Sequence, residues 1–433
     1  MARNHRIHYI RTTPDPSWMR DFTMFNLVAL LLVLTAIFAY FNYRYTKLPT
    51  TIGVMAGALI LSMLVIGLDW LGFHALKAYE ESALRSLDFT ATLMQGMLSF
   101  LLFAGALHVD LNKLKNQFWQ IGGLAIIGTI ASTLLVGFAI WYLLPFAGIQ
   151  LPLIYCLLFG ALISPTDPIA VLGILKSVNV PKKLETTIVG ESLFNDGVGV
   201  VLFILLLDIA VQGGQPSVGD TLTLFGREAV GGALFGLLLG SVVNRMLKDI
   251  DNYQIEILIT LATVMGGYAL ANALHISGPI AMVVVGLLIG NHGREFSMSA
   301  RTRGHLDIFW ELIDEILNAV LFVFLGLEIV LIAFPDHSVA ASLIVIAITL
   351  SARALTVGVP VLALPRWFDL PAGSAPLLTW GGVRGGISVA LALSIPVSPS
   401  SEIIVMLTYS VVLFSVFVQG LTIGAVAKRV CEK

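Results

Sequence analysis

The strongest constraint on this 433-residue chain is a series of apolar stretches, each close to the length of a membrane span. A helix needs about 20 apolar residues to cross the hydrocarbon core of a bilayer. We interpret thirteen stretches as spans, although the first is compatible with a peripheral position and the ninth is short, so twelve spans is the alternative. The stretches are 27–43, 51–73, 88–107, 117–146, 151–175, 184–211, 219–247, 255–274, 279–291, 305–333, 338–364, 372–395 and 402–428.

Composition supports a membrane protein and excludes several other classes. Hydrophobic residues make up 57% of the chain and charged residues 12%, about half of what a soluble domain usually carries. An open strand edge cannot be satisfied by lipid, so the spans are predicted to be helical and the fold to be an all-α polytopic membrane protein. The net charge of -2 argues against a nucleic-acid partner.

The chain divides into a polar N-terminal tail at 1–26, one transmembrane domain at 27–428 and a short tail at 429–433. No small-residue cleavage site follows the first apolar run, which we therefore interpret as a retained span. Lysines and arginines concentrate in alternate loops, and the excess predicts an outside N-terminus and a cytoplasmic C-terminus. The cell (inner) membrane is the expected location. The two cysteines, Cys156 and Cys431, differ too much in expected depth to form a disulfide.

The fifth span contains two prolines that flank a threonine and an aspartate. Pro165 and Pro168 enclose Thr166 and Asp167. Proline removes a backbone donor and clashes with the preceding turn, so the helix is predicted to break here. The ends of a broken helix expose backbone dipoles at mid-membrane depth, where ions can bind. The alternative is a simple proline kink with a hydrogen-bonded aspartate.

The sixth span carries a group of polar residues on one helix face. Glu191 and Asn195 are four residues apart, as are Ser192 and Asp196. Oxygen ligands suit hard cations such as Na+ or Li+. Asp167, Asp196, Ser192 and Thr166 are therefore candidate ligands of a dehydrated Na+. A purely structural polar network between helices is the alternative.

The twelfth span is predicted to be a second interrupted helix. Four glycines surround Arg384 in the segment 380–386. Glycine weakens the helix, and the arginine can balance the negative C-terminal ends of half-helices. The two breaks are seven spans apart, and an odd offset inverts the second copy in the membrane. We therefore expect an inverted repeat of approximately 27–211 and 255–428, linked by 219–247.

A second arginine within an apolar run, Arg353, needs an acidic partner, because an unpaired charge in a membrane is costly. Glu191 is our choice, since three free carboxylates would leave a cation site with too much negative charge. The pair would be structural. The acids of the spans from which this choice was made are Glu191, Asp196, Asp167, Glu256 and Glu328.

Together, six motifs resemble the NhaP-type sodium/proton antiporters of monovalent cation:proton antiporter family 1, which are bacterial relatives of animal sodium/proton exchangers. The resemblance implies an NhaA/NhaP-like fold of about thirteen helices with two interrupted helices, a homodimer, and no cofactor beyond the transported Na+ or Li+ and H+. The motifs are 164–168, 190–196, 276–279, 309–318, 324–328 and 381–386.

The resemblance also implies roles for single residues. Asp196 would bind proton and cation in turn, Asp167 would assist, and Thr166 and Ser192 would be further ligands. Asn195 would belong to the same cation- and proton-binding site, at the position where electrogenic relatives carry a second aspartate, which implies electroneutral exchange of one cation for one proton. Glu191 and Arg353 would form the structural ion pair. The expected activity is secondary active transport by alternating access, with a part in pH homeostasis.

Three alternatives remain beside Na+/H+ exchange. A K+/H+ antiporter of the same fold is the closest, because K+ also takes oxygen ligands. An intramembrane aspartyl protease would use Asp167 and Asp196, but the sequence contains no H-E-x-x-H, G-x-S-x-G or G-x-x-x-x-G-K motif, and we expect no enzyme. A channel is disfavoured because no carbonyl-filter loop is recognisable.

Overall fold

The helices of the protein follow the apolar stretches of its sequence. In the computed structural model, all regular structure of the described residues is helical. Among these residues, eight helices are long and apolar enough to cross a membrane. The all-α membrane fold is confirmed, and the number of thirteen spans stays a prediction. The structure describes residues 24–74, 77, 80, 96–111, 115, 117–167, 175, 178, 180–212, 218–293, 298–331 and 338–431.

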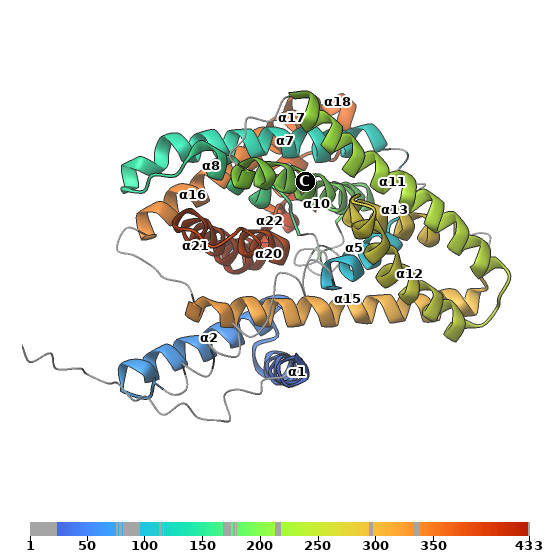
Figure 1. The fold of residues 1–433 in the computed structure, drawn as a ribbon, viewed down its shortest axis with the longest axis horizontal. Coiled ribbons are helices and arrows are strands. Elements are labelled where there is room, and N and C mark those ends of the chain that lie inside the picture. The colour runs from blue at the N-terminus through green and yellow to red at the C-terminus, as the bar shows by residue number, and fades with distance from the viewer. Residues whose placement is uncertain are drawn as a thin grey trace, which may run out of the picture.

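The helices form two groups that contact each other along one side (Figure 1). We call the first the flanking bundle. It consists of α1 (Met24–Phe41), α2 (Thr50–Trp70), α5 (Leu98–Leu107), α11 (Val218–Lys248), α12 (Tyr253–Ala273), α13 (Gly278–Leu288) and α15 (Ala300–Glu328). Within it, α15 packs along α2, and α13 packs between α5 and α11.

The second group, which we call the broken-helix bundle, contains both predicted interruptions. It consists of α7 (Phe118–Leu143), α8 (Leu153–Ile163), α10 (Lys182–Gln212), α16 (Ser338–Arg353), α17 (Val359–Ala363), α19 (Ser374–Trp380), α20 (Gly386–Leu393), α21 (Pro399–Phe414) and α22 (Gly420–Cys431). Single π-helical turns at Ala354–Gly358 and Ser415–Gln419 join α16 to α17 and α21 to α22, so each pair forms one continuous span.

The chain leaves helical structure at the two places where the sequence predicts breaks. Helix α8 ends at Ile163, and residues 164–167 are not helical. Helices α19 and α20 are separated by the glycine-rich residues 381–385. Both interruptions are thus confirmed, while the expected continuation of the fifth span at 168–174 lies outside the described residues.

The structure describes parts of both predicted terminal tails. Of the expected tail at 429–433, residues 429–431 are helical and continue α22. Lys428 and Arg429 occupy the last turn, where positive charge is favourable to the helix dipole, and this favours continued helix. Of the predicted N-terminal tail at 1–26, residues 1–23 lie outside the described residues, and 24–26 form the first turn of α1.

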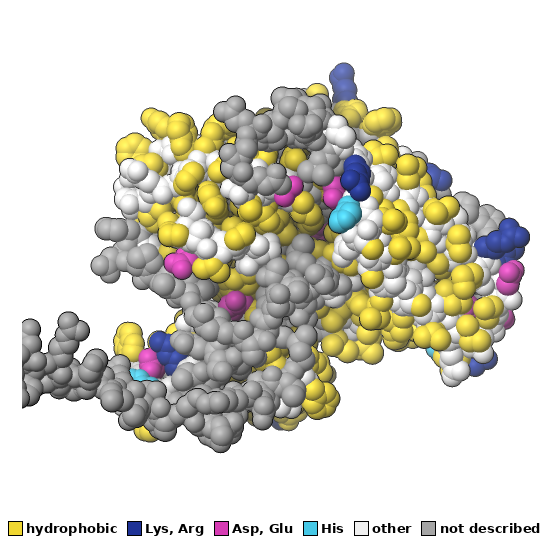
Figure 2. All heavy atoms as spheres, in the orientation of Figure 1, with side chains coloured by type: hydrophobic (Ala, Val, Ile, Leu, Met, Phe, Trp, Pro, Cys, Tyr) yellow, Lys and Arg dark blue, Asp and Glu magenta, His cyan; other side chains and the backbone are white. Residues whose placement is uncertain are grey.

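The outer surface carries many apolar side chains, as a lipid-facing surface requires. Figure 2 shows hydrophobic side chains spread over the visible face. On α7 alone, Trp119 is 76% exposed and Ile127 is 70% exposed, whereas Ile140 on the same helix is fully buried. One face of the helix therefore meets lipid, and the opposite face packs inside the protein.

Helices α7 and α8 approach each other closely because glycine stands at their contact. A Cβ atom at Gly160 would overlap the carbonyl oxygen of Thr133 on α7. A Cβ atom at Gly137 would lie 2.6 Å from Leu157 Cδ2 on α8. Since the first obstacle is backbone, it cannot move aside as a flexible side chain does.

We expect Gly160→Ala to lower the free energy of unfolding by about 1–3 kcal/mol, the usual cost of overpacking. The matched control is Gly266→Ala in α12, where a Cβ atom would meet nothing within 4 Å. Thermal unfolding in detergent, followed by tryptophan fluorescence, would compare the two. Equal melting temperatures for both variants would contradict close α7–α8 packing.

Candidate functional site

The two helix breaks meet and satisfy each other's backbone groups. The N–H of Asp167 donates a hydrogen bond to the carbonyl oxygen of Val383 at 2.7 Å. The guanidinium of Arg384, only 2% exposed, donates to the carbonyl oxygens of Pro165, at 2.9 Å, and Ser164. Arg384 therefore lies at the negative C-terminal end of α8, whose last carbonyls have no helical partner.

Gly385 allows this crossing to be tight. A Cβ atom at position 385 would overlap the carboxylate of Asp167. A side chain there would push the aspartate, or the whole broken segment, away from its position. The glycine-rich sequence thus serves close approach of backbone to a carboxylate, in addition to interrupting the helix.

A hydrogen-bonded network joins the first break to α10. The side-chain oxygen of Asn195 accepts a hydrogen bond from the Thr166 N–H at 3.1 Å, and its amide nitrogen donates to Thr166 Oγ1 at 2.8 Å and to Glu191 Oε1 at 2.9 Å. The hydroxyls of Thr166 and Ser192 lie 2.9 Å apart. All four side chains are at most 2% exposed. Asn195 therefore connects α10 to the first break through its described contacts.

Glu191 and Arg353 form a two-point ion pair between α10 and α16. Arg353 Nη1 donates to Glu191 Oε1 and Nη2 to Oε2, both at 2.6 Å. The side chain of Arg353 is 8% exposed and that of Glu191 is 1% exposed. Of the acids considered from the sequence, the structure thus brings Glu191 to Arg353. A Cβ atom at Gly382 would lie 2.5 Å from Arg353 Nε, so the second break also makes room for this arginine.

A cavity of about 440 Å³ between the two bundles reaches the candidate acids. Asp196 and Asp167 both line it, whereas Thr166, Ser192 and Asn195 do not and lie behind them in the hydrogen-bonded network. We call it the acidic cavity. Its lining residues are Leu101, Leu102, Gly105, His108, Asp167, Glu185, Val189, Leu193, Asp196, Asp307, Glu311, Asp314, Asn318, Leu321, Gly386 and Ile387.

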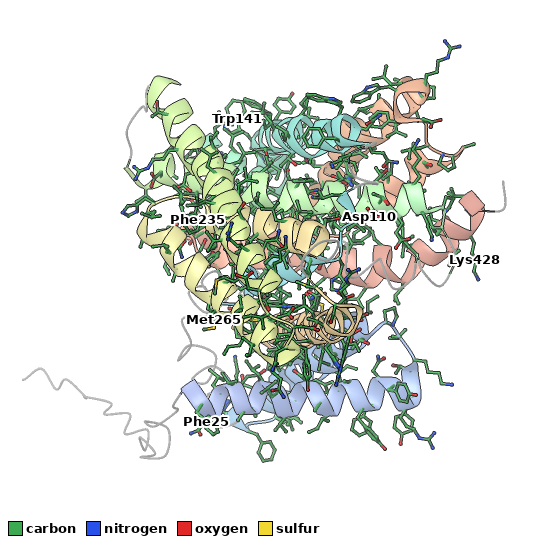
Figure 3. All side chains as sticks on the ribbon, turned by 90° about the vertical axis from the view of Figure 1, so that its right-hand side faces the viewer. Phe25, Asp110, Trp141, Phe235, Met265 and Lys428 are labelled. Carbon is green, nitrogen blue, oxygen red and sulfur yellow. The ribbon has the colours of Figure 1, made fainter. Side chains whose placement is uncertain are left out.

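The acidic cavity continues toward one side of the molecule. A neighbouring cavity of about 230 Å³ shares His108, Glu185 and Val189 with it and also contacts Asp110 and the exposed Lys182. In Figure 3, Asp110 lies toward the side that carries Lys428, and Phe25 at the start of α1 lies toward the opposite side. The candidate acids are therefore approached from the side of the molecule that carries Lys182.

Three acids on α15 that line the cavity were not among the residues singled out from the sequence. Asp307, Glu311 and Asp314 face it together with Asn318, whose amide donates to Asp314 Oδ1 at 3.1 Å. Their spacing of three or four residues puts them on one helix face. This shared face was the sequence pattern from which they could have been identified. The sequence motif at 309–318 was quoted for its resemblance only.

The arrangement favours a hard monovalent ion or a proton as ligand. The two carboxylates of Asp167 and Asp196 line the acidic cavity, and the hydroxyl groups of Thr166 and Ser192 lie behind them. Within the part of the chain that the structure describes, no group of three or more His, Cys, Asp or Glu side chains is placed to hold a metal ion.

We expect Arg353→Gln to lower the free energy of unfolding by about 3–5 kcal/mol, because it leaves Glu191 buried without its partner charge. Lys183→Gln is the control, since Lys183 pairs with Asp369 at 2.6 Å but the side chains are 36% and 85% exposed. That variant should unfold like the parent. Unfolding midpoints in detergent would be compared, and similar midpoints for all three proteins would show that the buried pair is dispensable.

Comparisons with known proteins identify the family of this chain. The family model described as "Sodium/hydrogen exchanger, transmembrane" matches residues 31–429. The Na+/H+ antiporter NhaP of Pseudomonas aeruginosa is 53% identical, over 94% of this chain and 97% of its own length. The Na+/H+ antiporter NhaH of Halobacillus aidingensis is 39% identical, over 86% and 91%.

The fold also matches a solved structure, that of the sodium proton antiporter MjNhaP1 from Methanocaldococcus jannaschii at pH 8. The TM-score is 0.75 at 20% sequence identity, and the match covers 94% of this chain and 99% of that one. At this identity the likeness speaks for the fold alone. With a family model that spans nearly the whole chain and a relative at 53% identity, this protein belongs to the transmembrane sodium/hydrogen exchanger family.

Proposed function

We propose that this chain is a secondary active transporter that exchanges Na+ or Li+ for H+ across the membrane by alternating access. The observation that carries the proposal is the pair Asp167 and Asp196 at the inner end of the acidic cavity. The names of its relatives NhaP and NhaH support Na+ as the cation. Thr166 and Ser192, next to the acids, would add hydroxyl ligands.

In this mechanism, cation and proton compete for one site. A protonated Asp196 cannot hold a cation, and a cation-bound Asp196 cannot hold a proton. If only the neutralised forms of the site cross between the two sides, each crossing carries one ion or the other, and exchange is enforced. Asp167 lines the same cavity and would contribute its carboxylate to the bound cation.

The charges around the site favour exchange of one cation for one proton. Glu191 is neutralised by Arg353. Arg384, whose charge interacts with that of Asp196, would offset one of the two carboxylates of Asp167 and Asp196 and leave one net negative charge on them. One Na+ or one proton removes that charge. Asn195 adds none, because its side chain is a neutral amide. This supports electroneutral transport.

The acidic cavity would face the cytoplasm. Its outer end is next to Lys182, at the start of α10, and α15 begins near it with Arg301 and Arg303. Positive residues gather on the cytoplasmic side of membrane proteins, so this side would be inside and the C-terminus cytoplasmic. The structure would then represent the inward-facing state, in the cell (inner) membrane. The proposal of a homodimer rests on the family resemblance, and that of an inverted repeat on the two breaks.

Asp196→Asn should reduce exchange to the level of protein-free liposomes, because the amide can neither release a proton nor balance a cation. The control is Asp208→Asn, which makes the same change at an exposed position of the same helix and should leave the rate unchanged. The assay follows a trapped pH dye after Na+ is added outside. Exchange that survived Asp196→Asn in folded protein would remove Asp196 from the mechanism.

The same liposomes test the cation and the stoichiometry. Na+ and Li+ should collapse an imposed pH gradient and choline should not, and clamping the membrane potential at zero should leave the rate unchanged. A response to K+ alone would keep the fold and change the substrate. A rate that depends on the clamp would contradict electroneutral exchange. No response to any cation between about pH 5 and 9 would overturn the proposal.

A further inference from the structure

One buried acid takes no part in the proposed mechanism. Glu328 is the last residue of α15, and its side chain is 7% exposed. It lies next to Leu325 and Leu327 of an apolar cluster that also contains Tyr409. The hydroxyl of Tyr409 lies beside the carboxyl group, yet neither Glu328 Oε2 nor Tyr409 Oη has a hydrogen-bond partner of good geometry within the described part of the chain.

No described positive charge is placed to balance an ionised Glu328. Helices α1, α5 and α20, which pack against α15, carry no Asp, Glu, Lys, Arg or His. Helix α2 carries Asp69, which is already bonded to His74 and Lys77. Helix α12 carries Glu256, which lies near Thr302 at the opposite end of α15.

The remaining titratable neighbours are a phenol and two acids. Tyr409 faces Glu328 from α21, whose first turn also carries the exposed Glu402. Ser62 of α2 donates hydrogen bonds to the Leu327 carbonyl oxygen, at 3.3 Å, and to Glu80 Oε1, at 3.1 Å. None of these three groups can supply a positive charge to balance an ionised Glu328 in this apolar setting. The neutral, protonated form is the one that the surroundings accept.

The position of Glu328 relates it to the movement of the two bundles. The acidic cavity follows α15 from Asp307 to Leu321, and Glu328 lies seven residues beyond Leu321, about 10 Å farther along the helix. Glu328 is therefore on the side of the site away from the cavity. It belongs to the flanking bundle and Tyr409 to the broken-helix bundle, so their contact closes the interface between the bundles on that side.

We infer that Glu328 is a second proton-binding site, distinct from the transport site, which holds a proton while the bundles are closed around it and releases it when that side opens to water. This inference rests on the proposed alternating access. Acid on that side keeps Glu328 neutral and favours the closed state, and alkali on that side favours opening. A single proton changes this balance by at most about tenfold per pH unit.

The bound proton can be tested without any transport. The infrared difference spectrum between the parent protein in detergent at neutral pH and Glu328→Gln should show the loss of one protonated-carboxyl band. Glu402→Gln, which removes an exposed acid, should show the loss of carboxylate bands instead. A loss of carboxylate bands on Glu328→Gln would overturn the inference. If Glu328→Gln does not fold, Tyr409→Phe is the second variant, because it leaves Glu328 in place. It should shift the protonated-carboxyl band of Glu328, and a band at an unchanged frequency would contradict the contact between Tyr409 and Glu328.

The effect on exchange is tested by varying pH on the side of Glu328 alone, with right-side-out and inverted vesicles at constant pH on the other side. The parent should lose rate toward acid pH on that side more steeply than Glu328→Gln, by up to about tenfold per pH unit, while Glu402→Gln should behave like the parent. Superimposable pH profiles of the parent and Glu328→Gln would overturn control by this proton. A parent without exchange would contradict the proposed function instead, and the infrared result would stand by itself.

Discussion

Backbone groups freed by a helix break inside a membrane have no water to bind, so they must bind each other or a side chain. In this protein the two breaks meet, and each supplies what the other lacks. The N–H of Asp167 finds the Val383 carbonyl, and Arg384 takes the carbonyls at the end of α8. This crossing fixes Asp167 at the cavity, and the glycine at 385 leaves room for it.

The buried charges are arranged so that few remain uncompensated. The Glu191–Arg353 pair binds α10 to α16 and, through Asn195, holds Thr166. An ion pair of this kind contributes little net stability in a low-dielectric interior, because desolvation offsets attraction, but it fixes geometry. We propose that the pair holds α10 against α16 while Asn195 holds α10 against the first break, so that the carboxylates of Asp196 and Asp167 line the same cavity.

The sequence was sufficient for features that follow from local chemistry. Pro165 within an apolar run and the four glycines around Arg384 were enough to predict the two breaks, and charge balance was enough to choose Glu191 for Arg353. Which residues line the cavity depends on which helix faces pack opposite each other. The sequence of one helix does not show which face of another helix it will meet. Asp307, Glu311 and Asp314 therefore went unassigned although they share a face, and the hydrogen bonds of the Asn195 amide to Thr166 and Glu191 were not predicted.

The distribution of acids between the bundles has a consequence for transport. The two candidate acids, both arginines and Glu191 belong to the broken-helix bundle, whereas Asp307, Glu311 and Asp314 belong to the flanking bundle. A movement of one bundle against the other would therefore carry the site as a unit and leave its hydrogen bonds intact. The acidic wall on α15 would stay behind, where it attracts cations to an open cavity without taking part in their release on the other side.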